Sequence, residues 1–395
     1  MMRRLAALAC LAACGGDPEP PPPDASIVGV PGTYEVRGIV RYEDRPATLE
    51  NNKAVVGAAV PMPARAVGVA VLDDATGTML AEGTTGEDGA YALSFDALGG
   101  QDVHILVVAQ STTAARPLTI SKPGNLIHGF GGQAFRAGLD TAHDVLVTEA
   151  SKAAQAFNIF DVCLHTLDRV RSVYGVANPV PLTVFWSSGS NDGTYYDGNA
   201  IHLLGSSSDD DGYDDTVILH ETGHYVEDKY GRSDSPGGSH GGAPTDPRLA
   251  WSEGFSTYWA MAIRDEPVYI DTNKDGGFGW NSDRDVTKAN PAQPLDQRIS
   301  EDTVTQVLWD LGDAGPDDDD PFDGVHDDVL SVQGEYLRTA TLRPVGRAGV
   351  DLVDFLDGWF LKAGLTACEG TRAIVTTTRT FPYDYAGPAG ACPAP

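Results

Sequence analysis

Two histidines and a glutamate lie within five consecutive residues, His220-Glu221-Thr222-Gly223-His224. On an α-helix, residues four apart are separated by about 40° around the axis, so both imidazoles can bind one metal ion. Glu221 lies on the same turn, where its carboxylate can accept a proton from a water molecule. The spacing therefore predicts a zinc site that activates water, although so short a pattern also arises by chance in unrelated chains.

A third protein ligand would separate a catalytic zinc site from a chance pattern. Glu253, His240 and Asp228 are the candidates. Asp228 follows His220 by about 12 Å of helical rise, too far to share its metal. His240 lies in a glycine-rich loop that has no evident restraint in the sequence. Glu253 lies among small residues on an otherwise apolar helix that Asp246 can cap, so we expect Glu253 to be the third ligand.

Residues 220–224, followed by Trp251-Ser252-Glu253-Gly254-Phe255, resemble the gluzincin metallopeptidases, which include thermolysin and the aminopeptidase N group. The resemblance implies that the two histidines and Glu253 bind zinc, that Glu221 is the general base, and that peptide bonds are hydrolysed. One residue separates Trp251 from Glu253 where the family usually has two. Thermolysin-like enzymes often carry an aspartate four residues after the ligand glutamate, whereas this chain has Thr257 there.

Other parts of a peptidase site are less clear from the sequence. Residues 199–205 (NAIHLLG) precede the motif helix, where zincins place an edge strand that aligns an extended substrate. His202 on this strand is either a polar contact or part of the surface. For stabilising the oxyanion, His326 competes with several tyrosines, namely Tyr258, Tyr269 and Tyr336.

The charge balance of the chain limits its partners. Its 395 residues include 56 acidic and 27 basic side chains, which give a formal net charge of −29. A surface this negative repels phosphate backbones, so we expect a peptide or protein substrate and no nucleic acid. The length favours two domains, and no pattern indicates the oligomeric state.

The first domain is predicted to be an all-β sandwich over residues 31–122. Short segments with alternating apolar residues are separated there by turn signals such as Gly86-Glu87-Asp88-Gly89. The stretch 83–95 (GTTGEDGAYALSF) resembles the carboxypeptidase regulatory-like, transthyretin-like domains. The matching residues are Thr85, Asp88, Gly89 and Tyr91. Such modules usually support or bind, which implies no catalytic role for this domain.

Residues 123–395 are predicted to form an α+β zincin-like metallopeptidase domain with a mainly helical C-terminal part. Helical periodicity begins in residues 149–175, and short strands follow before the motif. Three further helical stretches come after the motif, in residues 302–312, 324–342 and 350–365. The chain is therefore expected to be a multidomain protein in which strands precede helices.

The N-terminus reads MMRRLAALACLAACGGDPEPPPPDAS, which is typical of an export signal. Leu11-Ala12-Ala13-Cys14 resembles the lipobox of bacterial lipoproteins, so residues 1–13 are interpreted as the signal peptide and Cys14 as the lipidated residue. Residues 14–30 form a proline-rich tether. We expect a protein of the bacterial cell envelope, anchored to a membrane by lipid and facing outside the cytoplasm, or secreted. An ordinary signal peptide with incidental cysteines is the alternative.

The remaining cysteines and acidic loops allow further assignments. Cys368 and Cys392 could close the C-terminal tail with a disulfide in an exported protein, and Cys163 lies in an apolar helical pattern as a buried thiol. Asp271, Asn273 and Asp275 are spaced like the first half of a calcium loop. Ser282 stands where an EF-hand has glutamate, so a Ca²⁺ site of another geometry and a solvated turn both remain open.

Together these patterns favour a lipid-anchored surface metallopeptidase that uses zinc, with Ca²⁺ as a further candidate ion. The alternative is a non-enzymatic binding or adhesion protein on a degenerate peptidase scaffold. Retention of Glu221 favours the enzyme, because a scaffold has no use for a proton acceptor beside the metal.

The lipobox-like stretch leads to a testable prediction about anchoring. Replacing Cys14 with serine removes the thiol that would carry the lipid, so Cys14→Ser should move the protein from the membrane fraction to the soluble fraction. Fractionation followed by immunoblotting measures this. An unchanged membrane fraction would contradict the assignment.

Overall fold

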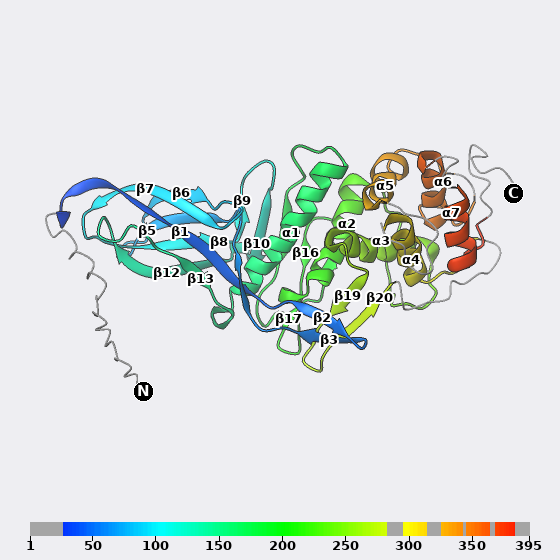
Figure 1. Cartoon of the computed structure of the whole chain (residues 1–395), viewed down its shortest axis with the longest axis horizontal. Coiled ribbons are helices and arrows are strands. Elements are labelled where there is room, and N and C mark those ends of the chain that lie inside the picture. Colours follow the sequence, from blue (N-terminus) through cyan, green and yellow to red (C-terminus); the bar gives the residue numbers. More distant parts are fainter. Residues whose placement is uncertain (1–26, 283–294, 314–324, 343–344, 364–367, 384–395) are drawn as a thin grey trace, which may run out of the picture.

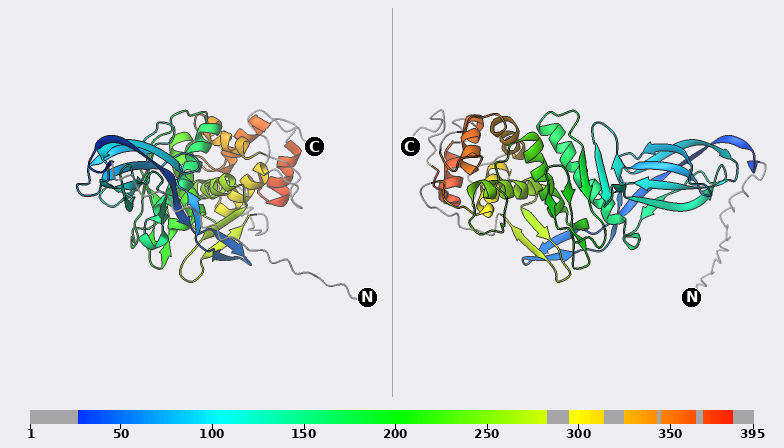
Figure 2. Two further views of the ribbon diagram at one scale, coloured as in Figure 1. Left: turned by 60° about the vertical axis from the view of Figure 1, so that its left-hand side comes forward. Right: turned by 180° about the vertical axis from the view of Figure 1, so that it is seen from behind.

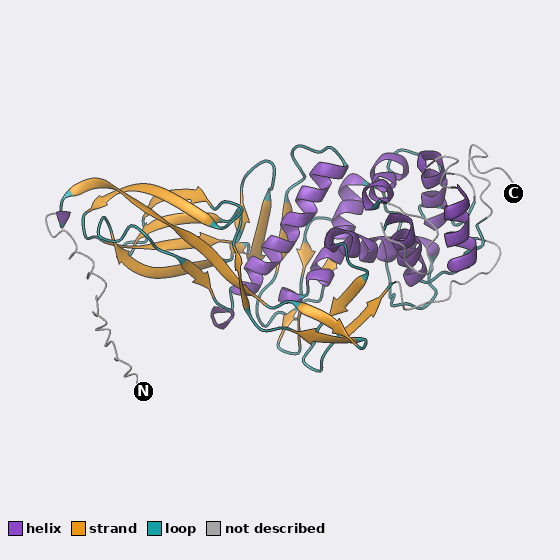
Figure 3. Cartoon of the chain, in the orientation of Figure 1, coloured by secondary structure: helices purple, strands orange, loops and turns teal. Residues whose placement is uncertain are grey.

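The computed structural model describes residues 27–282, 295–313, 325–342, 345–363 and 368–383. Strands gather at the N-terminal end of the elongated molecule and helices at the other end (Figures 1 and 3). The expected order of a strand-rich region followed by helices is therefore confirmed. Residues 1–26 and 384–395 lie outside the described residues, so the assignments of Cys14 and Cys392 fall there.

Two four-stranded sheets form the strand-rich end. The first is built on β1, which pairs with β7 and β4 in antiparallel fashion and with β13 in parallel. The second has the order β12-β8-β5-β6. Alternate residues of β8, Val103, Ile105 and Val107, are buried, as expected for a strand with one face on a core. The bounds are β1 Pro31–Asp44, β4 Val60–Pro63, β5 Gly68–Asp73, β6 Met79–Thr84, β7 Ala90–Leu98, β8 Asp102–Val108, β12 Gly129–Arg136 and β13 Val145–Val147.

A six-stranded sheet follows, in the order β11-β10-β14-β16-β15 with β9 also on β10. Along the sequence, strands of this sheet lie between strands of the two N-terminal sheets. Residues 110–127 belong to this sheet, whereas β12 and β13 return to the N-terminal sheets. A boundary between residues 122 and 123 would therefore separate β12 and β13 from their partners. The bounds are β9 Gln110–Ser111, β10 Leu118–Lys122, β11 Leu126–Ile127, β14 Leu182–Phe185, β15 Tyr195–Tyr196 and β16 Ile201–His202.

The strand expected at the edge of this sheet lies inside it. β16 pairs with β14 on one side and with β15 on the other. Among the described strands, β15 ends the sheet. The chain reverses between β15 and β16, where Gly198 adopts a left-handed φ angle of 89°, and this adds the strand that the sequence did not reveal.

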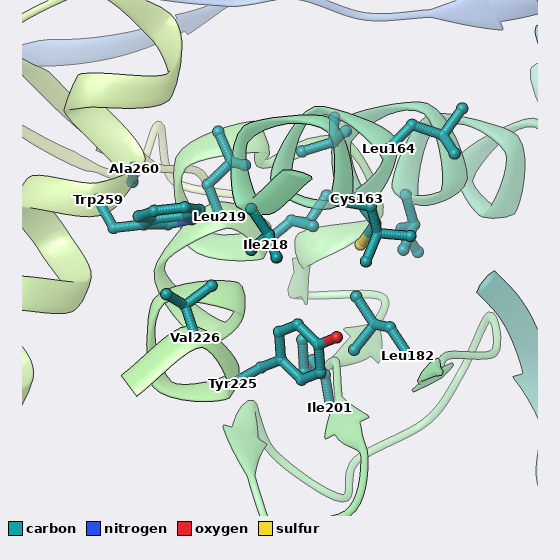
Figure 4. Close-up of a cluster of buried hydrophobic side chains, with 14 of the residues drawn as sticks. Cys163, Leu164, Leu182, Ile201, Ile218, Leu219, Tyr225, Val226, Trp259 and Ala260 are labelled. Atoms are coloured by element: carbon teal, nitrogen blue, oxygen red, sulfur yellow. The ribbon is translucent and has the colours of Figure 1, made fainter. Parts of the chain in front are cut away.

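Helices α1 (Ala154–Val173) and α2 (Asp215–Tyr230) pack on this sheet around a common apolar cluster (Figure 4). Leu164 and Cys163 of α1 meet Leu182 and Ile201 of the sheet and Tyr225 of α2. Cys163 is a free, buried cysteine, as expected. Each large apolar side chain buried in this way stabilises the fold by about 1.5–3 kcal/mol.

Helix α3 (Pro247–Arg264) begins where the sequence predicts. Asp246 caps it by accepting a hydrogen bond from the Arg248 N–H, and Pro247 occupies the first turn. Buried hydroxyls connect it to the earlier helices. The Trp259 indole donates to Thr222 of α2 over 3.1 Å, and Thr222 lies 2.7 Å from Thr166 of α1.

Helices α2 and α3 approach each other most closely at Gly223. A β-carbon added there would lie 2.6 Å from Cα of Ser256, closer than such atoms come in proteins. Only glycine permits this approach without moving the backbone of α3. The expectation that Gly223 lets another element come close is therefore confirmed.

The remaining helices surround α3 at the C-terminal end, where three helical stretches were expected. None of the described helices is long and apolar enough to span a membrane. Cys368 is disulfide-bonded. The bounds are α4 Glu301–Gly312, α5 His326–Ser331, a π-helical turn Val332–Leu337, α6 Leu352–Ala363, α7 Cys368–Arg372 and a second π-helical turn Ala373–Thr378.

A hairpin from the N-terminal region extends to the helical part. It consists of β2 (Ala47–Glu50) and β3 (Lys53–Val56), joined by Asn51-Asn52 with φ angles of 52° and 60°. These values suit a tight hairpin turn, and asparagine tolerates them. The hairpin contacts β19 (Val268–Asp271) and β20 (Phe278–Asn281), and the two hairpins lie side by side in each view (Figures 1 and 2).

The close approach at Gly223 gives a prediction about stability. Gly223→Ala gains about 1 kcal/mol of helix propensity, but its methyl group collides with the α3 backbone. We expect a net decrease of about 1 kcal/mol or more in the free energy of unfolding, measured by chemical denaturation. Ser172→Ala, at an exposed position of α1, is the control and should change it by less than about 0.5 kcal/mol.

Candidate metal centre

Helices α2 and α3 bring together His220, His224 and Glu253, three side chains that could hold a metal ion and are called the metal-binding residues below. Nε2 of His220 lies 3.2 Å and Nε2 of His224 lies 3.3 Å from Oε2 of Glu253. All three ligand atoms lie within 4.8 Å of one another. His220 has 8% of its surface exposed, and Glu253 has 9%. Two imidazole nitrogens and one carboxylate oxygen in this arrangement form a donor set typical of zinc.

The electrostatics of the three side chains reflect their mutual burial. Burial alone would lower the pKa of His224, but the hydrogen bond and charge of Glu253 outweigh it and raise the pKa to about 9. Burial also opposes ionisation of Glu253, and hydrogen bonds from His220 and His224 overcome it, so the pKa of Glu253 is lowered. The carboxylate is therefore ionised at neutral pH and needs a positive partner.

Hydroxyl groups on α3 hold the outer ring nitrogens of both histidines. Nδ1 of His220 lies 3.0 Å from Oγ1 of Thr257, and Nδ1 of His224 lies 3.0 Å from Oγ of Ser256. These contacts fix the orientation of the rings and leave both Nε2 atoms facing Glu253. Thr257 thus contacts a histidine from the position where thermolysin-like enzymes carry aspartate.

Ser252 extends this network to a buried acid that sequence reasoning did not identify. Its hydroxyl donates to Oε2 of Glu227 over 2.5 Å and lies 3.3 Å from Nδ1 of His224. Burial raises the pKa of Glu227 to about 7, against the opposing effect of the His224 charge. The spacing gave a signal, because Glu227 follows His224 by three residues and therefore lies on the same face of α2.

Glu221 lies beside the metal-binding residues but outside their hydrogen-bond network. Only 7% of its surface is exposed, and its Oε2 atom has no hydrogen-bond partner among the described residues. A buried carboxylate oxygen without a protein partner is costly unless a water molecule or ligand occupies the adjacent space. That space is a cleft of about 1140 Å³, which Glu221, both histidines and Glu253 line.

The loop that carries His240 is restrained, contrary to the expectation from its glycines. Gly242 donates its N–H to Oε1 of Glu301 over 3.1 Å, and its carbonyl accepts from Ser300 over 2.7 Å. Thr245 and Ile299 exchange two backbone hydrogen bonds. Gly241 and Gly242 reach φ angles of 132° and 72°, which let the loop fold onto the start of α4.

This anchoring places His240 next to the metal-binding residues. Its Nδ1 lies 3.2 Å from Glu301, and its Nε2 lies 3.6 Å from Oε2 of Glu253. The hydrogen bond to Glu301 raises the pKa of His240. His240 lines the cleft, yet it does not join the compact group of ligand atoms formed by the other three residues. It therefore lies beside the three ligand atoms without belonging to their group.

With this geometry established, the chain can be compared with known proteins. Residues 175–348 match the Mycolysin C-terminal domain. This is a family of metallopeptidase C-terminal domains, and the matched segment contains α2, α3 and the three expected ligands. The match supports a relationship to zinc peptidases.

The other comparisons add little. No curated protein matches the chain significantly. Among solved structures, a 9R-lipoxygenase from Cyanothece PCC8801 aligns at 12% identity with a TM-score of 0.17. The alignment covers 36% of this chain and 24% of the lipoxygenase, so this chain spans about a quarter of that protein's length. A TM-score this low is no evidence of a shared fold.

The structure also distinguishes among the other residues named from the sequence. Tyr269 lines the cleft, and its ring lies 6.1 Å from that of His220. His326 is instead buried against Tyr258, whose hydroxyl lies 3.0 Å from its Nδ1, and neither residue lines the cleft. His202 stacks on Tyr195 and contacts Asp197 away from the metal-binding residues.

Asp228 and Tyr336 likewise lie away from the three ligand atoms. Asp228 accepts a hydrogen bond from the Tyr196 hydroxyl at another part of the cleft wall. Tyr336 packs against Gly358 of α6 and does not line the cleft. Of the four residues named for oxyanion stabilisation, Tyr269 is the one that lines the cleft. His240, which was not among those four, lines the cleft as well.

The three residues named for calcium, Asp271, Asn273 and Asp275, do not form one group of ligands in the structure. Asp271 lies with Asp209 and Asp211, and the ligand atoms of these three lie within 4.8 Å of one another. Asn273 uses its side-chain oxygen to accept hydrogen bonds from the N–H groups of Asp275 and Gly277. The side chain of Asp275 is 81% exposed, next to Lys274. We refer to Asp209, Asp211 and Asp271 as the aspartate group.

The aspartate group leads to a prediction about pH. Burial, followed by repulsion from Asp271 and Asp209, raises the pKa of Asp211 to about 7. The pKa of an aspartate in the unfolded protein is about 4. At pH values between this pKa and that of folded Asp211, folding takes up a proton, so the contribution of Asp211 to stability falls as pH rises. Asp211→Asn should become more stable relative to the wild type between pH 5 and pH 8.

Urea unfolding of the metal-free proteins at both pH values measures this difference. Asp275→Asn removes an exposed acid from the neighbouring loop and serves as the control, with no such trend expected. Equal pH dependence of the Asp211 variant and the wild type would show that Asp211 ionises normally.

Proposed function

We propose that this chain is a zinc-dependent metallopeptidase that hydrolyses peptide bonds in the cleft between α2, α3 and the β19–β20 hairpin. The observation that carries the proposal is the convergence of His220, His224 and Glu253 beside the unpartnered carboxylate of Glu221. The match of residues 175–348 to a metallopeptidase family supports it independently. A zincin-like fold for the second domain is part of the proposal.

The side chains suit a zinc ion on chemical grounds. The outer nitrogen of each histidine contacts a hydroxyl, so each Nε2 can present its lone pair to a metal. Contacts with His220 and His224 lower the pKa of Glu253 against the effect of burial, so Glu253 offers a negative oxygen. Three protein ligands leave a coordination position open, which is typical of catalytic rather than structural zinc sites.

Zinc bound here would polarise the substrate carbonyl and make a coordinated water more acidic. The chain itself provides the proton transfers. Glu221 accepts a proton from the attacking water and passes it to the amide nitrogen as that nitrogen leaves. Its unpartnered oxygen and its position on the cleft wall suit this role. His240, oriented by Glu301, is placed to hydrogen-bond an oxygen of the bound peptide.

Strand β15 provides a means of aligning the substrate. It ends the sheet among the described strands, and Tyr195 and Tyr196 both line the cleft. An extended peptide can add to such an edge through backbone hydrogen bonds, which hold it without reading its sequence. This arrangement replaces the expected role of β16, which is already paired on both sides.

The proposal extends to location and partners. Lipidation at Cys14 would hold the enzyme at a bacterial membrane, facing outside the cytoplasm, with the proline-rich segment as a spacer. Peptides or proteins are the proposed partners, and nucleic acid is not, because of the negative charge of −29. For calcium near Asp271, the aspartate group offers the ligands rather than Asn273 and Asp275, and calcium is the alternative to the occupant inferred for that group below.

Two variants test the proposed roles. Glu221→Gln keeps the ligands but removes the base, so zinc content should stay at the wild-type level while turnover falls by about 100-fold or more.

Glu253→Ala removes a ligand, so zinc affinity and activity should both fall sharply. Zinc is measured by mass spectrometry after dialysis, and turnover with casein and a peptide library.

His240→Ala is the matched control for metal binding, because His240 touches Glu253 without joining the ligand atoms. It should retain zinc. Full zinc occupancy in a folded Glu253→Ala protein would refute the ligand assignment. A zinc-loaded wild type that cleaves no peptide would favour the alternative, a binding protein on a peptidase scaffold.

A further inference from the structure

The described residues that line the cleft are strongly acidic. None of them is lysine or arginine. Because like charges in a partly enclosed space repel one another, such a lining attracts cations and repels acidic groups. Apart from Glu221, Glu227 and Glu253, the acids of the lining are Asp209, Asp211, Asp228, Asp271, Glu301 and Asp302.

Three of these acids form the aspartate group at one end of the cleft. Asp209 belongs to the short strand β18 (Asp209–Asp210), Asp211 follows it, and Asp271 ends β19. Burial and repulsion from Asp209 raise the pKa of Asp271 to about 6. Oδ1 of Asp209 is buried without a hydrogen-bond partner among the described residues. No described cation neutralises this group within the cleft.

A second observation points to a ligand in the same cleft. The side chain of Glu221 is more than nine-tenths buried, lines the cleft and leaves Oε2 unpartnered. Tyr269 and the three residues of the aspartate group line the same cleft as Glu221. The unpartnered oxygen and the aspartate group therefore border one continuous space.

The distance between the aspartate group and the metal-binding residues suits a substrate residue close to the cleaved bond. Tyr269 lies next to His220, and Asp271 follows it by two residues on the same face of β19, with the intervening Ile270 buried. Side chains two apart on a strand are separated by about 7 Å. An extended peptide held at the zinc site would place a nearby side chain at the aspartate group.

Aromatic rings complete this part of the wall. Trp280 lies opposite Tyr269, and Phe278 lies opposite Asp271, across the β19–β20 ladder. Directly opposite residues share a face of a sheet, and all four line the cleft. Phe278 is 58% exposed. A ring beside a carboxylate suits the side chain of lysine or arginine, whose stem packs on the ring while its charge meets the acid.

We propose that the aspartate group and Phe278 form a subsite for a lysine or arginine side chain, so that the enzyme selects basic peptides. This inference rests on the proposed peptidase function, because it takes the metal-binding residues as the place of cleavage. A basic side chain would relieve the repulsion among the three carboxylates and cover the exposed ring. An acidic side chain at the same position would be excluded.

Sets of matched peptides test the subsite. A single arginine is moved through the positions around the cleaved bond and is replaced in turn by lysine, by glutamate and by citrulline, which has nearly the shape of arginine without its charge. For the favoured position, we expect kcat/KM to be at least about tenfold higher with arginine or lysine than with citrulline, and lowest with glutamate. The ratio should decrease as salt rises.

Variants localise the effect. In Asp211→Asn/Asp271→Asn the preference for arginine over citrulline should fall below about threefold, and Asp271→Asn alone should lower it partly. The single variant also keeps the test decisive if the double variant does not fold, as judged by circular dichroism. Asp275→Asn is the matched control, since it removes an exposed acid four residues from Asp271 that does not line the cleft.

A binding measurement separates failure of this inference from failure of the proposed function. Glu221→Gln protein loaded with zinc is titrated with the same labelled peptides, and fluorescence anisotropy is recorded. Cleavage without any charge preference would overturn the subsite and leave the peptidase assignment intact. If no peptide is cleaved, tighter binding of the arginine peptide to this variant still supports the subsite, and equal binding of all peptides refutes it.

Calcium is the competing cation for the aspartate group, and it is an outcome of the same experiment. The assays are repeated in EGTA and in millimolar calcium. Stoichiometric calcium binding that depends on Asp211 and Asp271 and abolishes the preference for arginine would show that the group is a metal site, and the proposed subsite would be wrong.

Discussion

The close contact between α2 and α3 at Gly223 determines the geometry of the candidate metal centre. Because no side chain separates the helices there, Ser256 reaches Nδ1 of His224 and Glu253 reaches both Nε2 atoms. Contacts of about 3 Å between side chains on two helices leave little tolerance for a shift of either backbone. The buried hydroxyl of Thr222 and the Trp259 indole stabilise the same crossing from the other side of α2.

Burial of charge is the second constraint on the site. His220, Glu221, Glu227 and Glu253 are all at least nine-tenths buried, in a protein whose net charge is −29. Buried carboxylates raise the free energy of the folded protein unless cations or hydrogen bonds compensate them. The histidines compensate Glu253, and Ser252 partly compensates Glu227. Within the described residues, Oε2 of Glu221 and Oδ1 of Asp209 lack a hydrogen-bond partner, whereas Asp211 accepts a hydrogen bond from Thr194, and all three residues line the cleft.

The sequence predicted the parts of this arrangement that depend on local periodicity and capping. The motif helix was inferred from spacing, and the next helix from Asp246 and Pro247 at its start. The convergence of Glu253 with the two histidines was inferred from its place among small residues on that helix and from the family resemblance. Contacts between distant segments could not. The return of β12 and β13 to the N-terminal sheets, the pairing of β16 on both sides and the grouping of Asp271 with Asp209 depend on tertiary folding. His240 was misjudged because its restraints come from Glu301 and Ser300, about 60 residues later.

The β2–β3 hairpin gives the N-terminal strands a part in the shape of the cleft. Asn52 at its tip lines the cleft, and the Leu49 side chain occupies the space that a β-carbon at Gly279 would need. The wall carrying Phe278 and Trp280 therefore has the hairpin behind it instead of solvent. As a result, the strand-rich region and the helical region are not structurally independent of each other. A change in the position of the first region would be transmitted to the width of the cleft.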